Sequence, residues 1–105
     1  MELHTGITGI DEIEVTQANT AEAVGSGTLP VFATPAMLAS MEKAAYTSVQ
    51  SYLDEGCGTV GILLNAEHLA ASPIGMHVRT ESELTEIDGR VLTFAVRSYA
   101  GGELI

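Results

Sequence analysis

The sequence is poor in basic residues, with four Lys and Arg against 14 Asp and Glu and a formal net charge of -10. Proteins that bind nucleic acids neutralise phosphates with a basic surface, so this composition argues against a nucleic-acid partner. The same shortage argues against attraction to an anionic membrane surface. We therefore expect neither nucleic acid nor membrane as a partner.

Cysteine and long apolar segments are also scarce. A single cysteine, Cys57, excludes an internal disulfide. No stretch approaches the roughly 18 apolar residues of a membrane span, and the N-terminus lacks the basic segment and apolar run of a signal peptide. We expect a soluble cytoplasmic protein. The 105 residues, 46% of them hydrophobic, suffice for a single domain over residues 1–105.

The clearest element that the sequence predicts is a helix. Thr34 at the N-cap, followed by Pro35 at the first helical position, is a start signal, and Gly56 is a stop signal. Between them the apolar residues gather on one broad face, which predicts a helix of about twenty residues. Glu42 falls inside this apolar stripe, so either its carboxylate is buried or its head group reaches water.

Four further segments have strand patterns. Residues 10–17 alternate as a half-buried strand, and residues 59–68 are apolar on both faces, as in a central or doubly covered strand. Residues 76–87 and 91–99 alternate and are joined by Asp88-Gly89, a favoured hairpin turn. A long helix against one face of an antiparallel sheet is an α+β architecture of two layers.

The segment VFATPAMLASMEKAA (residues 31–45) resembles thioesterases of the hot-dog fold, and more narrowly the fluoroacetyl-CoA thioesterase-like group. The resemblance continues through GSGTLPVFATP, TVGILLNAEHLAASPIGM and ELTEIDGRVLTFAV, and covers nearly the whole chain from about Val15 onward. It implies a hot-dog fold, with an antiparallel sheet wrapped around one long central helix. It also places the family's final strand after residue 105, where this sequence ends.

In that group a threonine just before the helix, a glutamate on it and a histidine in the next strand carry the chemistry. The matching residues are Thr34, Glu42 and His68. The family's glycine in the strand after the helix matches Gly61, whose backbone N–H would lie near the thioester carbonyl. The resemblance thus implies a metal-independent acyl-CoA thioesterase that works as a homodimer, with CoA entering only as part of the substrate.

Each of these side chains also has a structural explanation. A threonine N-cap satisfies a free N–H, although a helix N-terminus also favours the negative charge that develops on a thioester oxygen. His68 is either a hydrogen-bonded structural histidine or a proton shuttle. A carboxylate at Glu42 suits a general base or a nucleophile. No histidine has zinc-site spacing to a cysteine or carboxylate, so no metal is expected.

Three residues are secondary candidates for binding substrate. Met37 and Met41 lie at helical spacing in the core and are expected to line an acyl pocket as well, because methionine adapts to irregular shapes. Asn65 could donate a hydrogen bond to the substrate.

Two functions of different classes stay open at this point. One is a thioesterase that hydrolyses a small or short-chain acyl-CoA, and the other is a non-catalytic hot-dog module that binds an acyl ligand. Thr34 and Glu42 are about 12 Å apart by helical rise, too far for direct contact in one subunit. The resemblance implies an interface site, in which Glu42 of one subunit approaches His68 or Thr34 of its partner.

Overall fold

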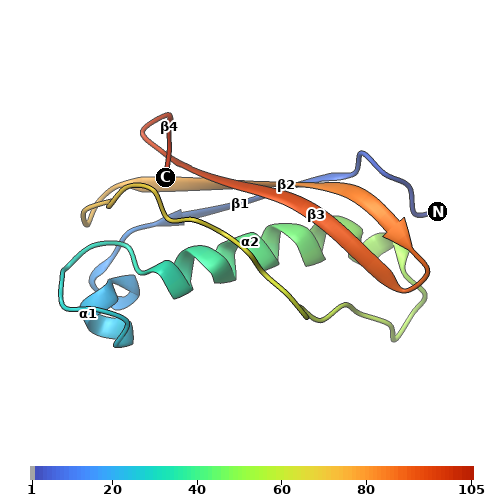
Figure 1. Cartoon of the computed structure of the whole chain (residues 1–105), viewed down its shortest axis with the longest axis horizontal. Coiled ribbons are helices and arrows are strands. Elements are labelled where there is room, and N and C mark those ends of the chain that lie inside the picture. Colours follow the sequence, from blue (N-terminus) through green and yellow to red (C-terminus); the bar gives the residue numbers. More distant parts are fainter. Residues whose placement is uncertain (1) are drawn as a thin grey trace.

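The computed structural model describes residues 2–105 and shows one antiparallel sheet with α2 along one of its faces (Figure 1). The strands follow one another in the order β1-β2-β3-β4. Their bounds are β1 Thr8–Glu14, β2 His77–Asp88, β3 Val91–Ala100 and β4 Glu103–Leu104, and α2 spans Thr34–Val49. The shorter elements are the 3-10 helices η1 Gln17–Asn19 and η2 Gln50–Tyr52 and the short helix α1 Ala21–Val24. These layers confirm the α+β expectation.

The alternation in β2 places its two faces as predicted. Val78, Thr80, Ser82 and Leu84 are buried beneath α2, whereas His77 and Arg79 are exposed on the outer face. The hairpin turn lies one residue later than predicted. Because Asp88 pairs with Val91, Gly89 and Arg90 form the turn, and Gly89 takes the positive φ of 61°.

The helix and sheet meet through an apolar core with a polar link beside it. Val15, Phe32, Met37, Met41, Val78, Ala100 and Ile105 form one buried cluster. Next to it the hydroxyl of Ser40 donates to Asp11 Oδ2 (2.8 Å), which ties α2 to β1. A Cβ at Gly9 would collide with the carbonyl of Ala44, so glycine allows β1 to approach α2 closely.

The bounds of α2 differ from the predicted helix at both ends. Ala33 occupies the N-cap, so Thr34 is the first helical residue and Pro35 the second. At the other end α2 stops at Val49 and the chain tightens into η2, which gives 16 α-helical residues instead of about twenty. Tightening into a 3-10 turn is common where a helix ends.

The prediction of a central strand at residues 59–68 was wrong. This extended segment belongs to no strand that the structure describes, and Val60 and Leu63 are each 85% exposed. It runs beside α2, back toward the N-terminal end of that helix (Figure 1). Just beyond it, the N–H groups of Leu69 and Ala70 donate to the Ile105 carbonyl. A strand that is apolar on both faces needs neighbours on both, and within residues 2–105 this segment has few.

Two smaller differences concern the N-terminal third. The first strand lies at Thr8–Glu14 instead of residues 10–17. The segment between Ala18 and Phe32, expected as an irregular loop, contains α1 and is closed by a bridge between Thr20 and Phe32. Thr20 caps α1, because its hydroxyl accepts a hydrogen bond from the N–H of Ala23 (3.2 Å). No helix within residues 2–105 has the length and apolarity required to cross a bilayer.

Candidate active site

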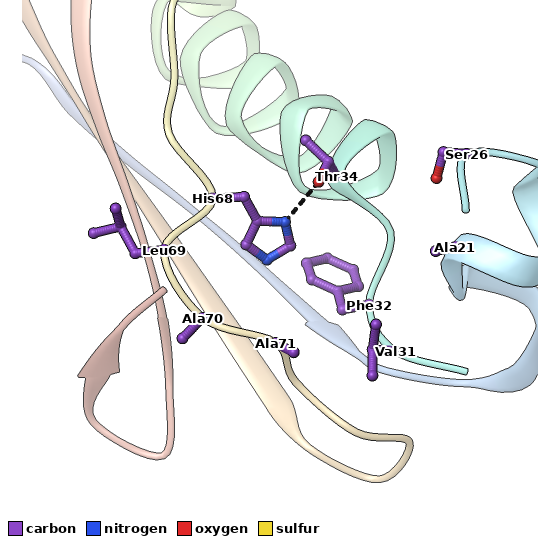
Figure 2. A pocket seen from close by; sticks show the side chains of 9 residues that line it. All are labelled: Ala21, Ser26, Val31, Phe32, Thr34, His68, Leu69, Ala70 and Ala71. Atoms are coloured by element: carbon purple, nitrogen blue, oxygen red, sulfur yellow. Dashed lines mark hydrogen bonds between the residues drawn. The ribbon is translucent and has the colours of Figure 1, made fainter. Parts of the chain in front are cut away.

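The hydroxyl of Thr34 and the Nδ1 atom of His68 are 2.8 Å apart (Figure 2). Thr34 begins α2, and His68 lies on the extended segment that runs back along this helix. Because Ala33 holds the N-cap position, the Thr34 hydroxyl is not used to cap the helix. The fold therefore brings two of the residues predicted for catalysis into direct contact, and leaves the hydroxyl available to the imidazole.

The surroundings of His68 favour its neutral form. Burial lowers the pKa of His68 below its ordinary value of 6.5, and a hydrogen-bonding backbone group of Ala70 opposes this shift in part. The ring of Phe32 meets the imidazole edge-on, with the centroids 6.4 Å apart. At pH 7 the imidazole is therefore mainly uncharged and can accept a proton.

Thr34 and His68 form part of the wall of a cavity of about 260 Å³ (Figure 2). The other lining residues are Ala21, Ser26, Val31, Phe32, Leu69, Ala70 and Ala71. Sequence reasoning named none of these seven as site residues. A signal for Phe32 was available, because it lies in the VFATP stretch just before Thr34. The contributions of α1 and of residues 69–71 depend on how distant segments pack, so no local pattern could show them.

Glu42 lies apart from this pair and is exposed. Of the two alternatives for Glu42, the structure shows the one in which its head group reaches solvent, because the side of α2 that carries Glu42 faces the extended segment instead of the sheet. A Cβ placed on Gly61 would lie 2.7 Å from Glu42 Oε2, so Gly61 packs directly against this carboxylate. The extended segment thus brings Gly61 to Glu42 and His68 to Thr34, at two points about 12 Å apart along the helix.

The other predicted binding residues do not line the cavity. Met37 and Met41 are buried in the core, at 0% and 5% exposure, because the sheet covers the helix face that carries them. They do not line this cavity, and their role in an acyl pocket stays a prediction. Asn65 is exposed on the extended segment, between Gly61 and His68.

The titratable side chains do not gather into a metal site. Within residues 2–105, no group of three or more His, Cys, Asp or Glu side chains is placed to hold a metal ion. The remaining histidines, His4 and His77, are exposed as expected, and His77 Nε2 lies 3.5 Å from a carboxylate oxygen of Glu12.

Comparison with known proteins places the chain in a family. The family model described as fluoroacetyl-CoA-specific thioesterase matches residues 15–105. The chain belongs to this family. The fluoroacetyl-CoA thioesterase of Streptantibioticus cattleyicolor is 37% identical over 71 residues, which are 68% of this chain and 51% of that protein. The chain thus spans about half the length of this curated relative.

Solved structures agree with this assignment. One is a mutant of the fluoroacetyl-CoA-specific thioesterase in complex with fluoroacetate and CoA (TM-score 0.91, 28% identity, 98% of this chain and 87% of that one). A hot-dog-like protein from Thermanaerovibrio acidaminovorans, at 18% identity, has a TM-score of 0.86 over 96% of this chain and 75% of its own. The expected fold, a hot-dog sheet around one long helix, is confirmed.

The contact between Gly61 and Glu42 leads to a prediction about the thioesterase family's glycine. Gly61→Ala is expected to lower kcat/KM for acyl-CoA hydrolysis by about tenfold or more, because the added Cβ must displace the Glu42 carboxylate. The matched control is Gly58→Ala on the same segment, where the nearest atom to a new Cβ is Gln50 Oε1 at 4.0 Å. Equal rates for the two variants would show that the position of Glu42 does not matter.

Proposed function

We propose that this protein is an acyl-CoA thioesterase that hydrolyses a small or short-chain acyl thioester. The observation that carries the proposal is the contact between the Thr34 hydroxyl and His68 Nδ1 at the wall of a cavity. Membership of the fluoroacetyl-CoA-specific thioesterase family supports it, as does the relative solved with fluoroacetate and CoA. Hydrolysis adds water across the C–S bond and releases a carboxylic acid and a free thiol.

The tautomer of His68 assigns a direction to the Thr34 hydrogen bond. Nδ1 faces the Thr34 hydroxyl, whereas Nε2 is buried and has no hydrogen-bond partner among the described residues. We infer that Nε2 carries the proton and that Nδ1 accepts the hydrogen bond from Thr34. His68 then takes the proton from the Thr34 hydroxyl as its oxygen attacks the thioester carbonyl carbon. The C–S bond breaks, and the leaving thiolate takes this proton from His68. Water then hydrolyses the Thr34 ester, which releases the carboxylic acid and restores the hydroxyl. A thiol leaving group, with a pKa near ~8.5, needs little acid assistance.

The carboxylate of Glu42 completes the proposed site from a second copy of the chain. Within one chain it lies about two helical turns from Thr34, too far for direct contact with the Thr34 hydroxyl. As the carboxylate of a neighbouring subunit, it would activate the attacking water as a general base. Gly61, packed against it, would present its backbone N–H to the thioester oxygen.

We propose a homodimer, formed in the cytoplasm, that covers the extended segment. Val60, Ile62 and Leu63 are exposed at 85%, 80% and 85%, which is an unusual run of apolar side chains for a free surface. Backbone groups along residues 59–66 belong to no strand that the structure describes, and such edges pair readily with another chain. The single cysteine, Cys57, is unpaired, as is usual in a reducing compartment.

Assembly is tested by placing a charge on this segment. Leu63→Lys is expected to convert a dimer into monomers of 11.0 kDa and to abolish hydrolysis, because the charge would be buried between subunits. Sedimentation at micromolar concentration measures the change. Val91→Lys, at a half-exposed position of the β2–β3 hairpin, is the control and should stay dimeric. A monomeric wild-type protein would contradict the proposal.

The function itself is tested by release of thiol. The protein is incubated with short-chain acyl-CoAs and a thiol reagent, and the proposal expects turnover that depends on enzyme concentration. Binding of acyl-CoA in calorimetry without any released thiol would instead identify a non-catalytic acyl-binding module.

A further inference from the structure

Small side chains form part of the wall of the cavity beside Thr34 and His68, together with Val31, Phe32 and Leu69. The small side chains in this wall are those of Ala21, Ser26, Ala70 and Ala71. Ala21 and Ser26 lie on the opposite side of the cavity from His68 (Figure 2). An acyl group whose carbonyl lies at the Thr34–His68 pair would therefore extend toward α1 and the loop that follows it.

Hydrogen bonds hold this far wall in place. The carbonyl of Ala21 accepts from the N–H groups of Gly25 and Ser26, both at 3.0 Å, and of Gly27 at 3.3 Å. The N–H of Ala21 in turn donates to the Val31 carbonyl (2.8 Å). A larger side chain at position 21 would thus project from a fixed backbone into the cavity, instead of moving the wall away.

The size of the cavity exceeds the needs of a two-carbon acyl group. Its volume is about 260 Å³. A water molecule takes up ~30 Å³ of liquid, and a methylene group is of similar size, so roughly eight such groups fit. Two carbons with their oxygen would fill less than half of this space, and the thiol arm of CoA would approach from the open side.

The charge around the cavity selects against acidic acyl groups. None of its lining residues is Lys or Arg, and His68 is neutral because burial lowers its pKa. The chain has only four Lys and Arg, at Lys43, Arg79, Arg90 and Arg97. A carboxylate at the far end of an acyl chain would therefore meet no positive partner, and the net charge of -10 would repel it.

We propose that the acyl site takes an uncharged acyl chain of about four to six carbons, and that Ala21 and Ser26 set its length. This inference rests on the proposed thioesterase function and names the substrate class of the same site. It separates this chain from an enzyme specialised for a two-carbon acyl group.

The test compares kcat/KM for acetyl-, butanoyl-, 3-methylbutanoyl-, hexanoyl- and succinyl-CoA. We expect the butanoyl to hexanoyl substrates to exceed acetyl-CoA by about tenfold or more, since each buried methylene contributes to discrimination. Succinyl-CoA, which has the four acyl carbons of butanoyl-CoA but a carboxylate in place of the terminal methyl, should fall at least about tenfold below butanoyl-CoA. Acetyl-CoA as the best substrate, or succinyl-CoA equal to butanoyl-CoA, would overturn the inference.

Substitutions at Ala21 and Ser26 test whether these residues limit the length of the acyl chain. Ala21→Leu and Ser26→Leu should each raise the acetyl-to-butanoyl ratio of kcat/KM by about tenfold. Ala23→Leu makes the same change on α1 at an exposed residue that does not line the cavity, and should leave the ratio unchanged. An equal effect of Ala21→Leu and Ala23→Leu would remove Ala21 from the acyl site.

Binding gives an independent measurement if no thiol is released. Calorimetry with butanoyl-CoA and acetyl-CoA should show the same preference in Kd as the kinetics. If no thiol is released but butanoyl-CoA binds more tightly than acetyl-CoA, the proposed hydrolase function is wrong and the inference about acyl length stands. Equal Kd values for the two thioesters, or tighter acetyl-CoA binding, would reject that inference whatever the outcome for catalysis.

Discussion

His68→Asn is expected to lower kcat/KM for acyl-CoA hydrolysis by about 10²–10⁴-fold, the usual contribution of a positioned general base. The substitution removes the nitrogen that lies 2.8 Å from the Thr34 hydroxyl, while asparagine keeps a polar side chain of similar reach. Thr34→Val, which removes the other partner with little change in shape, should give a loss of comparable size. The rates are measured by thiol release at saturating and subsaturating acyl-CoA.

The matched control is His77→Asn on the outer face of β2, which does not line the cavity. His77 is exposed and faces Glu12, so its loss should change kcat/KM by less than about twofold. If His68→Asn kept most of the activity while lowering the melting temperature, His68 would be a structural residue and the proposed roles of the pair would be wrong.

The pH dependence of stability and of activity follows from the titration of His68. Burial lowers the pKa of His68 below 6.5, so the unfolded chain binds more protons than the folded chain in this pH range. The stability linked to His68 is fully present above pH 6.5 and is lost as the pH falls through the lowered pKa. Activity that needs the neutral imidazole should fall over the same acid range. In His68→Asn the acid loss of stability from this group should be absent, which pH-dependent thermal unfolding measures.

The sequence predicted the parts of the fold in which buried and exposed residues alternate regularly along a strand. In β2, strict alternation identified Val78, Thr80, Ser82 and Leu84 as inward-facing, and the structure buries all four. The same reasoning failed for residues 59–68, where apolar residues on both faces predicted a covered strand. Composition shows that such a segment needs covering on both faces, but does not identify which chain or segment covers it.

The sequence predicted only those residues of the site that belong to the motif shared with the thioesterase family. The resemblance named Thr34 and His68, and the structure places them in contact, although their catalytic roles stay predictions. Helical periodicity left it open whether Glu42 is buried or exposed, because an angular position does not say which flank of α2 the sheet covers. Ala21 and Ser26 were missed because only the tertiary packing brings them into the wall of the same cavity as Thr34.

Mixing Thr34→Ala chains with Glu42→Gln chains is expected to restore activity that neither variant has alone. If each site combines Thr34 and His68 of one subunit with Glu42 of the other, a mixed dimer has one intact site and one site with both changes. Random pairing makes half of the dimers mixed, so recovery should reach about a quarter of the wild-type rate. The variants are refolded together, the mixed dimers are quantified by mass, and thiol release is measured.

A second mixture shows whether the recovery has this origin. Thr34 and His68 are in contact within one chain, so Thr34→Ala and His68→Asn damage the same half of a site. Their mixed dimer has no intact Thr34–His68 pair on either side, and its activity should equal the sum of the separate variants. If the first mixture also gave no more than that sum while mixed dimers were present, Thr34 and Glu42 of one chain would have to serve the same site. Because about 12 Å of helix separates these residues, such a site would require water or substrate to link them, instead of direct contact.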